Sequence, residues 1–232
     1  MLQKLLFSLL DLKEEELGIY LVHLERATER LPLIDELKNK LGLTFIDFPS
    51  ADGKKLIEEG HPDGSVEYEG MHCGAGNLGC TISHVNICKD ALQKGFKYVL
   101  VFEDDSIFKQ SYEEFEIYLT TCFQLLKANS IDIHLFLLGN TSHLNFHPLT
   151  RFLAQIFEFY GTNALLMSRR YMELLLVEHE KTFKDGKVRS ADDLYSKTVQ
   201  NNSLNCFACL ESEYFFEQKK KAYSYIVEGI RK

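Results

Sequence analysis

Basic residues are scarce in this sequence relative to acidic ones. The 232 residues include 26 Lys and Arg against 34 Asp and Glu, which gives a formal net charge of −8. A chain with this balance repels nucleic acid, and we expect no nucleic-acid partner. The exception is a basic C-terminal tail, residues 211–232, with Lys219, Lys220 and Lys221 in a row. We interpret this tail as a solvated final helix, with peripheral contact to an anionic membrane surface as the alternative.

Long apolar runs are lacking as well, and no segment approaches the length of a membrane span. Residues 1–16 begin with a short apolar stretch that ends in acidic residues instead of the small residues of a cleavage site. They predict an N-terminal helix or extension of the mature protein, with a degenerate signal sequence as the alternative. The expected location is therefore the cytoplasm.

Cysteine clusters and proline-rich linkers are also scarce. Of the six cysteines, only Cys206 and Cys209 form a C-x-x-C pair, and no second pair completes a structural zinc site. The chain has only four prolines and neither repeats nor low-complexity segments. We expect a single domain over residues 1–232.

Apolar segments rich in β-formers alternate with segments of helical periodicity. The predicted strands include 18–24, 43–48, 97–105, 132–140 and 203–209, and the predicted helices include 27–42, 77–95, 111–130 and 169–181. This alternation predicts an α/β sandwich with a mostly parallel central sheet.

Three glycines, Gly74, Gly76 and Gly79, have the G-x-G-x-x-G spacing of dinucleotide-binding sites. Such a site needs a buried apolar strand before the glycines, but the preceding segment contains Glu67 and Glu69. We therefore interpret the spacing as coincidental. We expect Gly74 and Gly76 to form a flexible loop and Gly79 to let the start of the helix pack closely.

Three consecutive acidic residues, Glu103, Asp104 and Asp105, end the apolar segment YVLVF. In a continuing strand, Glu103 and Asp105 point to one face and Asp104 to the other. Clustered carboxylates at the carboxyl edge of a sheet are costly without a cation, and their hard oxygens suit Mg²⁺ or Mn²⁺. We favour such a metal site over the alternative, a solvated turn in which Asp105 caps the next helix.

The segment GNLGCTISHVNICKDALQKGFKYVLVFEDDSIF resembles the core of glycosyltransferase family 25, in which a G-x-x-G-C-x-x-S-H helix start precedes a strand ending in Glu-Asp-Asp. Further segments resemble the family in the expected order over most of residues 18–200: YLVHLERATERLPLI, FIDFPSADGKKL, FYGTNALLMSRRYMELLL and SADDLY. Three residues depart from the family pattern: His23 replaces asparagine, Glu25 aspartate and Asn163 histidine. These departures concern nucleotide and acceptor contacts.

The resemblance implies a GT-A type nucleotide-binding sandwich that uses a UDP-sugar and Mn²⁺ (or Mg²⁺). Members of the family transfer galactose to bacterial lipooligosaccharide or to collagen hydroxylysine. The implied reaction is therefore transfer of a hexose, with galactose favoured, to a hydroxyl of a saccharide or protein acceptor. By the same resemblance Asp105 binds the metal, Glu103 reaches the metal or the ribose, and Asp104 supports them. A divalent cation there stabilises the charge that builds on the departing diphosphate.

The resemblance also implies residues around the donor. The expected donor-binding residues, besides the acidic triplet, are Arg26, Arg30, Asp52, Gly53, Ser83, His84 and Asn163. The two arginines are expected at the phosphates, with solvated side chains as the alternative. Asp52 and Gly53 are expected beside the nucleoside, although an ordinary Asp-Gly turn also explains them. His84 is as readily a packed core residue as a residue that lines the site.

An inverting transfer needs a carboxylate that takes the proton of the acceptor hydroxyl. Asp192 and Asp193 are the candidates, although Ser-Ala-Asp-Asp is equally a helix start without chemistry. Two other functions remain open. One is a metal-dependent phosphoesterase, which needs a second cluster of ligands. The other is a nucleotide-sugar-binding protein without transfer activity.

Overall fold

The computed structural model of the chain describes residues 1–61, 67–68, 71–72, 74–139, 142–184, 188–210 and 215–218. The predicted basic tail lies outside the described residues except for 215–218, and so does Cys73.

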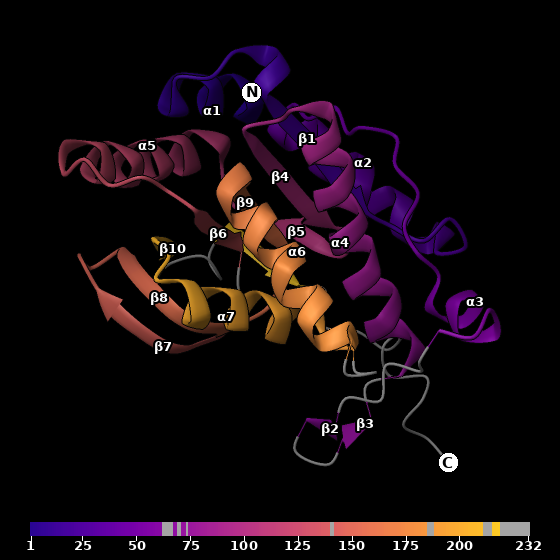
Figure 1. Cartoon of the computed structure of the whole chain (residues 1–232). Coiled ribbons are helices and arrows are strands. Elements are labelled where there is room, and N and C mark those ends of the chain that lie inside the picture. The colour runs from indigo at the N-terminus through magenta and orange to yellow at the C-terminus, as the bar shows by residue number, and fades with distance from the viewer. Residues whose placement is uncertain are drawn as a thin grey trace.

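A seven-stranded sheet forms the centre of the fold (Figure 1). Its strands are β1 (Leu17–Val22), β4 (Tyr98–Glu103), β6 (Leu135–Gly139), β7 (Ser142–Pro148), β8 (Leu153–Tyr160), β9 (Ala164–Ser168) and β10 (Cys206–Cys209), in the order β1-β4-β9-β6-β10-β8-β7. β1 pairs with β4, and β6 with β10, in parallel, whereas β8 and β9 run antiparallel to both of their neighbours. The expected α/β class is confirmed, but the sheet is mixed rather than mostly parallel because β9 inserts between β4 and β6 in the opposite direction.

Helices cover both faces of this sheet. On one face lie α4 (Ala75–Lys94), α6 (Arg169–Lys184) and α7 (Ala191–Asn202); on the other lie α1 (Leu2–Leu10), α2 (Leu31–Leu41) and α5 (Tyr112–Ala128) (Figure 1). Each face of the sheet has its own apolar core beneath its helices. Side chains alternate along β4, so Val99 and Val101 belong to the core under α4, α6 and α7, and Leu100 and Phe102 to the core under α1, α2 and α5. All four are fully buried. β4 is thus apolar on both faces until it reaches its acidic end.

Shorter elements complete the described chain. They are the 3-10 helices Glu14–Glu16 and Thr28–Arg30, helix α3 (Gly53–Glu58), the pair β2 (Glu67–Tyr68) and β3 (Met71–His72), and the pair β5 (Ser106–Phe108) and β11 (Phe216–Gln218). The two small pairs form sheets of their own.

The prediction of a strand at 43–48 is wrong. This segment has no strand structure, and the Ile46 amide donates one hydrogen bond of 2.8 Å to the Ile19 carbonyl of β1. Phe45 packs against one core and Ile46 and Phe48 against the other. The apolar pattern therefore reflects side-chain packing rather than a strand ladder.

Local sequence signals set the helix ends. Ser111 and Ser190 cap α5 and α7, since each hydroxyl accepts a hydrogen bond from the amide three residues on. Gly95 ends α4 with φ of 82°. α4 begins at Ala75, so the flexible loop expected at Gly76 is wrong, because that glycine lies within the helix.

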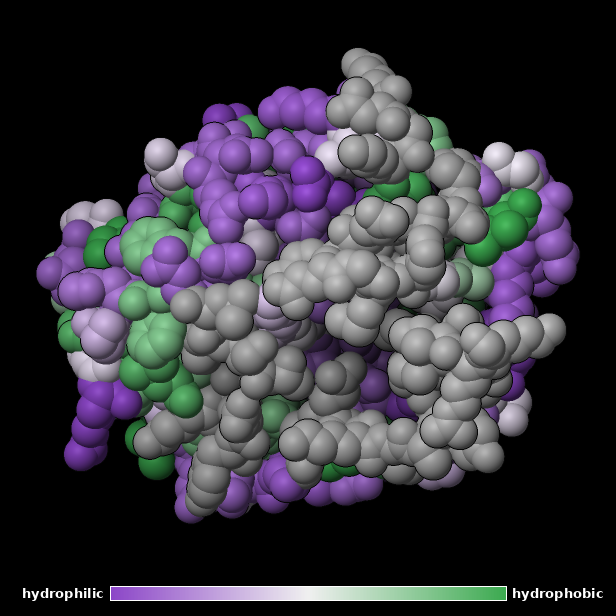
Figure 2. Space-filling model, turned by 90° about the horizontal axis from the view of Figure 1, so that it is seen from below, coloured by the Kyte–Doolittle hydropathy of each residue, from purple (hydrophilic) through white to green (hydrophobic). Residues whose placement is uncertain are grey.

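The surface is consistent with a chain rich in charged residues. On the face seen in Figure 2, hydrophilic side chains predominate among the described residues. Within the described part of the chain, no helix combines the length and the apolar character that crossing a membrane requires.

Candidate active site

A cavity of about 480 Å³ opens at the carboxyl ends of β1, β4 and β8. Its walls come from the turns after these strands, the start of α3, the first turns of α4 and the start of α7. Most of the residues predicted for the site line it: Arg26, Arg30, Asp52, Gly53, Ser83, Glu103, Asp104, Asp105 and Asp192. The structure therefore gathers residues from positions 26 to 192 around one space.

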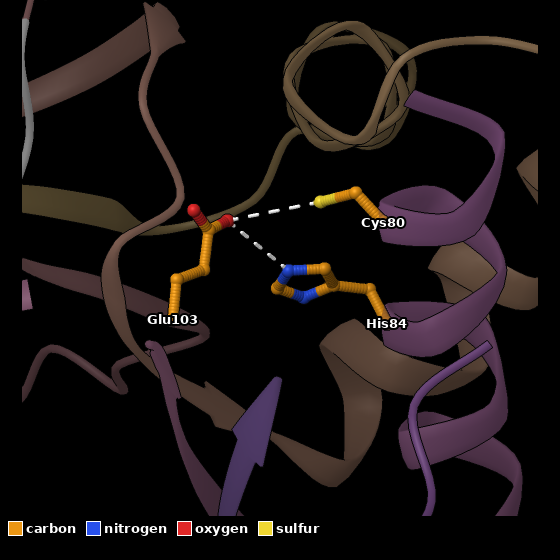
Figure 3. A group of neighbouring side chains, drawn as sticks. All are labelled: Cys80, His84 and Glu103. Carbon is orange, nitrogen blue, oxygen red and sulfur yellow. Dashed lines mark hydrogen bonds and ion pairs between the residues drawn. The ribbon is translucent and has the colours of Figure 1, made fainter. Parts of the chain in front are cut away.

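Glu103 is the last residue of β4, and its carboxylate faces α4. Its Oε1 accepts a 2.5 Å hydrogen bond from the Thr162 hydroxyl, and it lies 3.4 Å from His84 Nε2 and 3.8 Å from Cys80 Sγ (Figure 3). Burial works to raise the pKa of Glu103, but the neighbouring His84, Thr162 and Cys80 side chains outweigh it and lower the pKa. Glu103 is therefore held as a carboxylate.

Asp104 and Asp105 form the turn that follows β4, and both face Arg30. The Arg30 guanidinium nitrogen lies 3.8 Å from Asp104 Oδ1 and 3.5 Å from Asp105 Oδ2. His23 Nδ1 contacts Asp104 Oδ2 at 2.9 Å. The predicted alternation of faces is wrong here, because the strand ends at Glu103 and the turn brings the two aspartates to one cation. Burial raises the pKa of Asp104, although His23 and Arg30 oppose this.

The side chains expected at the nucleotide form a second charged group. Arg26 Nε contacts Asp52 Oδ2 at 3.0 Å, and Asp52 caps α3 by accepting the Lys54 amide. The Lys54 side chain also lines the cavity. Arg26 is more exposed than Arg30, whose side chain is 9% exposed.

Close packing of α3 against α4 shapes the cavity wall. A Cβ on Gly53 would lie 1.7 Å from the Ala75 carbonyl oxygen, and one on Gly79 would lie 2.8 Å from the Ala51 carbonyl oxygen. The expectation that Gly79 permits close packing is confirmed. The Ser83 hydroxyl accepts from the Ala51 amide and donates to the Gly79 carbonyl, and so ties the segment before α3 to α4.

His84 and Asn163 are not among the cavity-lining residues. His84 is fully buried behind Glu103, and its Nδ1 lies 3.0 Å from the Tyr195 hydroxyl. Asn163 is also buried, and its carbonyl accepts hydrogen bonds from the Glu103 amide and the Ser106 hydroxyl. Both residues therefore touch the acidic segment from behind.

Asp192 and Asp193 have different surroundings. Asp192 lines the cavity, and its Oδ1 accepts a hydrogen bond from the Gly161 amide at 3.1 Å. Burial, together with the charge of Glu103, raises the pKa of Asp192 to about 6. Asp193 forms an ion pair with Arg189 and is not among the cavity-lining residues. The helix-start interpretation also holds, because α7 begins at Ala191 with a Ser190 cap.

Two sets of donors near the cavity suit metal ions. The Asp104 and Asp105 carboxylates supply hard oxygens of the kind that Mn²⁺ and Mg²⁺ prefer. Cys80, His84 and Glu103 place one sulfur, one nitrogen and one oxygen within 4.8 Å of one another. The first set suits the predicted Mn²⁺ or Mg²⁺. Of the two ligands predicted for that metal, Asp105 belongs to this set, whereas Glu103 belongs to the second, softer combination.

Sequence reasoning did not assign roles to several residues of the site. Cys80 lies inside the G-x-x-G-C-x-x-S-H segment, and Thr162 inside the Gly-Thr-x-Ala segment. Lys54 follows the Asp-Gly turn directly. Each therefore lies within a segment that resembles the family and that could have revealed it.

These features define an α/β protein with a ligand cavity rich in carboxylates at the carboxyl end of its central strands. The family model described as "Glycosyltransferase family 25 (LPS biosynthesis protein)" matches residues 16–187, and the chain belongs to this family. Two curated relatives, each named "Glycosyltransferase 25 family member", agree with this. The Drosophila melanogaster relative is 31% identical over 104 residues, which are 41% of this chain and 17% of the relative. The Anopheles gambiae relative is 33% identical over 99 residues, 39% of this chain and 17% of the relative.

Some solved structures share weaker likeness. UDP-glucose pyrophosphorylase in its apo form has a TM-score of 0.36 at 12% identity, over 57% of this chain and 51% of that chain. A glycosyltransferase involved in glycosylation of the major capsid of PBCV-1 has a TM-score of 0.31 at 11% identity, over 84% of this chain and 92% of that chain. At these scores the likenesses assign neither substrate nor reaction to this chain.

Proposed function

We propose that this chain is a metal-dependent hexosyltransferase that moves a sugar, galactose by preference, from a UDP-sugar to a hydroxyl of a saccharide or hydroxylysine-type acceptor with inversion. The observation that supports this most is the cavity, where an acidic turn, basic side chains and a partly buried carboxylate of raised pKa meet. Family membership supports the reaction class.

The charge of the cavity supports a need for a cation. The carboxylates of Asp52, Glu103, Asp104, Asp105 and Asp192 line it against the basic side chains of Arg26, Arg30 and Lys54. A diphosphate that enters this space meets an excess of negative charge, which disfavours its binding. When bound, a divalent cation at Asp104 and Asp105 supplies neutralising charge and stabilises the leaving diphosphate.

The basic side chains then have a defined task. Arg26 contacts Asp52 at the start of α3, and Lys54 lies on that helix. Both line the cavity, and we assign both to the donor phosphates. Arg30 bridges Asp104 and Asp105 and keeps the two carboxylates together. Thr162 and His84 keep Glu103 oriented beside the same space.

Asp192 is the group we assign to proton transfer. Asp192 lines the same cavity as the acidic turn, and a pKa of about 6 leaves it mostly ionised at neutral pH yet able to hold a proton. In the proposed step the acceptor oxygen bonds to the anomeric carbon, the sugar–phosphate bond breaks, UDP departs, and Asp192 takes the hydroxyl proton.

A panel of UDP-sugars incubated with the protein and Mn²⁺ tests the proposal through UDP release. We expect slow hydrolysis that is fastest with UDP-galactose and is abolished by chelator. Cleavage of a generic phosphodiester with no preference for nucleotide-sugars would replace the proposal with a phosphoesterase.

A further inference from the structure

The side chains of Cys80, His84 and Glu103 converge at one edge of the cavity (Figure 3). Cys80 and His84 are four residues apart on α4, so they lie on one face of the helix. Glu103 approaches from the end of β4. Two rigid elements therefore hold three donor atoms of different kinds within 4.8 Å of one another.

We propose that Cys80, His84 and Glu103 form a binding site for a thiophilic divalent cation such as Zn²⁺, separate from the hard-oxygen pair Asp104 and Asp105. This inference does not rest on the proposed transferase activity, because it concerns metal binding alone.

The distances between the donors fit a small cation. In a tetrahedral zinc site, ordinary bond lengths put nitrogen and oxygen ligands about 3.3 Å apart and sulfur and oxygen ligands about 3.5 Å apart. Here His84 Nε2 lies 3.4 Å from Glu103 Oε1, and Cys80 Sγ lies 3.8 Å from the same oxygen. The third pair, Cys80 Sγ and His84 Nε2, lies within 4.8 Å, so these two atoms need to approach each other by at most about 1 Å to share a coordination shell.

The imidazole of His84 is oriented for binding a cation. It is fully buried, and its Nδ1 is engaged by the Tyr195 hydroxyl, which leaves Nε2 directed at Cys80 and Glu103. Nε2 makes no hydrogen bond of ordinary geometry to a described residue. Hydrogen bonding at the far nitrogen is the usual way in which proteins orient metal-binding histidines. A cation bound between Nε2 and Glu103 would replace their 3.4 Å contact with a bond to each atom.

The surroundings also favour a cation with an open coordination position. Cys80 and Glu103 both line the cavity, so the fourth position faces ligand or water, as in zinc sites with three protein ligands. The Cys80 thiol lies 3.8 Å from the Glu103 carboxylate oxygen. Binding of Zn²⁺ forms a sulfur–zinc bond and releases the thiol proton to solvent.

Cobalt spectroscopy tests the site on the full chain after removal of metals. We expect one equivalent of Co²⁺ to give a thiolate-to-cobalt charge-transfer band, which Zn²⁺ abolishes by displacement. Cys80→Ser should lose the band and bind Zn²⁺ at least about tenfold more weakly, with an unchanged circular dichroism spectrum. Cys88→Ala, a matched thiol control on the same helix, should keep the band.

Asp105→Asn separates this site from the one in the proposed function. It should lose Mn²⁺ binding and keep the cobalt–thiolate band, so the two proposals can fail independently. Absence of the band in the wild-type protein, or a band that survives in Cys80→Ser, would overturn the inference.

X-ray absorption spectroscopy of the wild-type protein with one equivalent of Zn²⁺ is a second test of the proposed ligands, and it needs no variant. One sulfur in the first coordination shell is expected. A shell of nitrogen and oxygen alone would show that the three side chains only pack against one another.

Discussion

Asp105 belongs to a turn in which Arg30 faces both aspartates, at 3.5 Å from Asp105 and 3.8 Å from Asp104. Replacing Asp105 with asparagine removes one negative charge and one anionic ligand while keeping the size of the side chain. We expect Asp105→Asn to lower UDP release by about two orders of magnitude or more, because leaving-group stabilisation by a metal is worth several kcal/mol. The rate of UDP release, measured by steady-state kinetics, and the affinity for Mn²⁺ should decrease together.

Asp35→Asn is the matched control, since Asp35 is exposed on α2 and is not among the residues that line the cavity. It should leave both quantities unchanged. If Asp105→Asn released UDP at the wild-type rate, the proposal that this turn binds the metal would be wrong.

Asp192 and Asp193 are adjacent in sequence but differ in setting, because only Asp192 lines the cavity. We expect Asp192→Asn to abolish transfer to the acceptor and Asp193→Asn to retain most of it. In the wild type, kcat/KM should rise with pH around an apparent pKa near about 6, since the ionised form of Asp192 is the base. A pH profile that is unchanged in Asp192→Asn would contradict this assignment.

The same residue predicts an effect on stability in the absence of metal. The pKa of Asp192 rises from 3.8 to about 6 in the fold, so the folded state binds this proton more tightly than the unfolded state. The contribution of this group to the free energy of unfolding is therefore fully present below the unfolded-state pKa of 3.8 and is lost as pH rises through the folded-state pKa of about 6. A shift of about two units corresponds to about 3 kcal/mol. Asp192→Asn should raise the unfolding temperature at about pH 8 and change it little at about pH 4.

The sequence pointed to most of these residues because they lie within short motifs of the family. It did not predict which way they face. The expected alternation of Glu103 and Asp105 failed because the position at which β4 stops depends on the partner strands. Likewise, the sequence does not say which residue of the Asp-Asp pair faces the cavity, because this depends on the ion pair between Arg189 and Asp193.

At the scale of elements, the contact between α3 and α4 determines one wall of the cavity. Gly53 is the position with least room, since a Cβ there would lie 1.7 Å from the Ala75 carbonyl oxygen. Backbone cannot move aside as a flexible side chain can, so Gly53→Ala should destabilise the fold by about 1–3 kcal/mol or more. Chemical denaturation measures this loss.

Glu58→Ala is the control for that variant, because it truncates an exposed side chain on the same helix. Its effect should be within about 0.5 kcal/mol. If Gly53→Ala were as stable as the wild type, α3 would not pack on α4 at this distance.

Helices were more predictable than sheet pairing. The segments predicted as helices at 77–95, 111–130 and 169–181 correspond to α4, α5 and α6, because caps and periodicity are local. Pairing is not local: β9 lies between β4 and β6, so the mixed sheet follows from contacts between distant segments. The apolar segment 43–48 shows the same limit, since its pattern fits packing and strand equally well.

At the scale of the whole molecule, charge connects the sequence to the proposed chemistry. The chain has a net charge of −8, and carboxylates outnumber basic side chains around the cavity. An anionic donor therefore approaches an anionic protein, and salt should weaken this repulsion only in part because the cavity is partly shielded. The proposed function thus requires that donor and cation bind together.

Calorimetric titration of UDP with and without Mn²⁺ tests this central claim most directly. We predict saturable UDP binding with Mn²⁺, binding at least about tenfold weaker without it, and loss of this difference in Asp105→Asn. Equal affinity for UDP in the presence and absence of the cation, in the wild type as in the variant, would contradict the account.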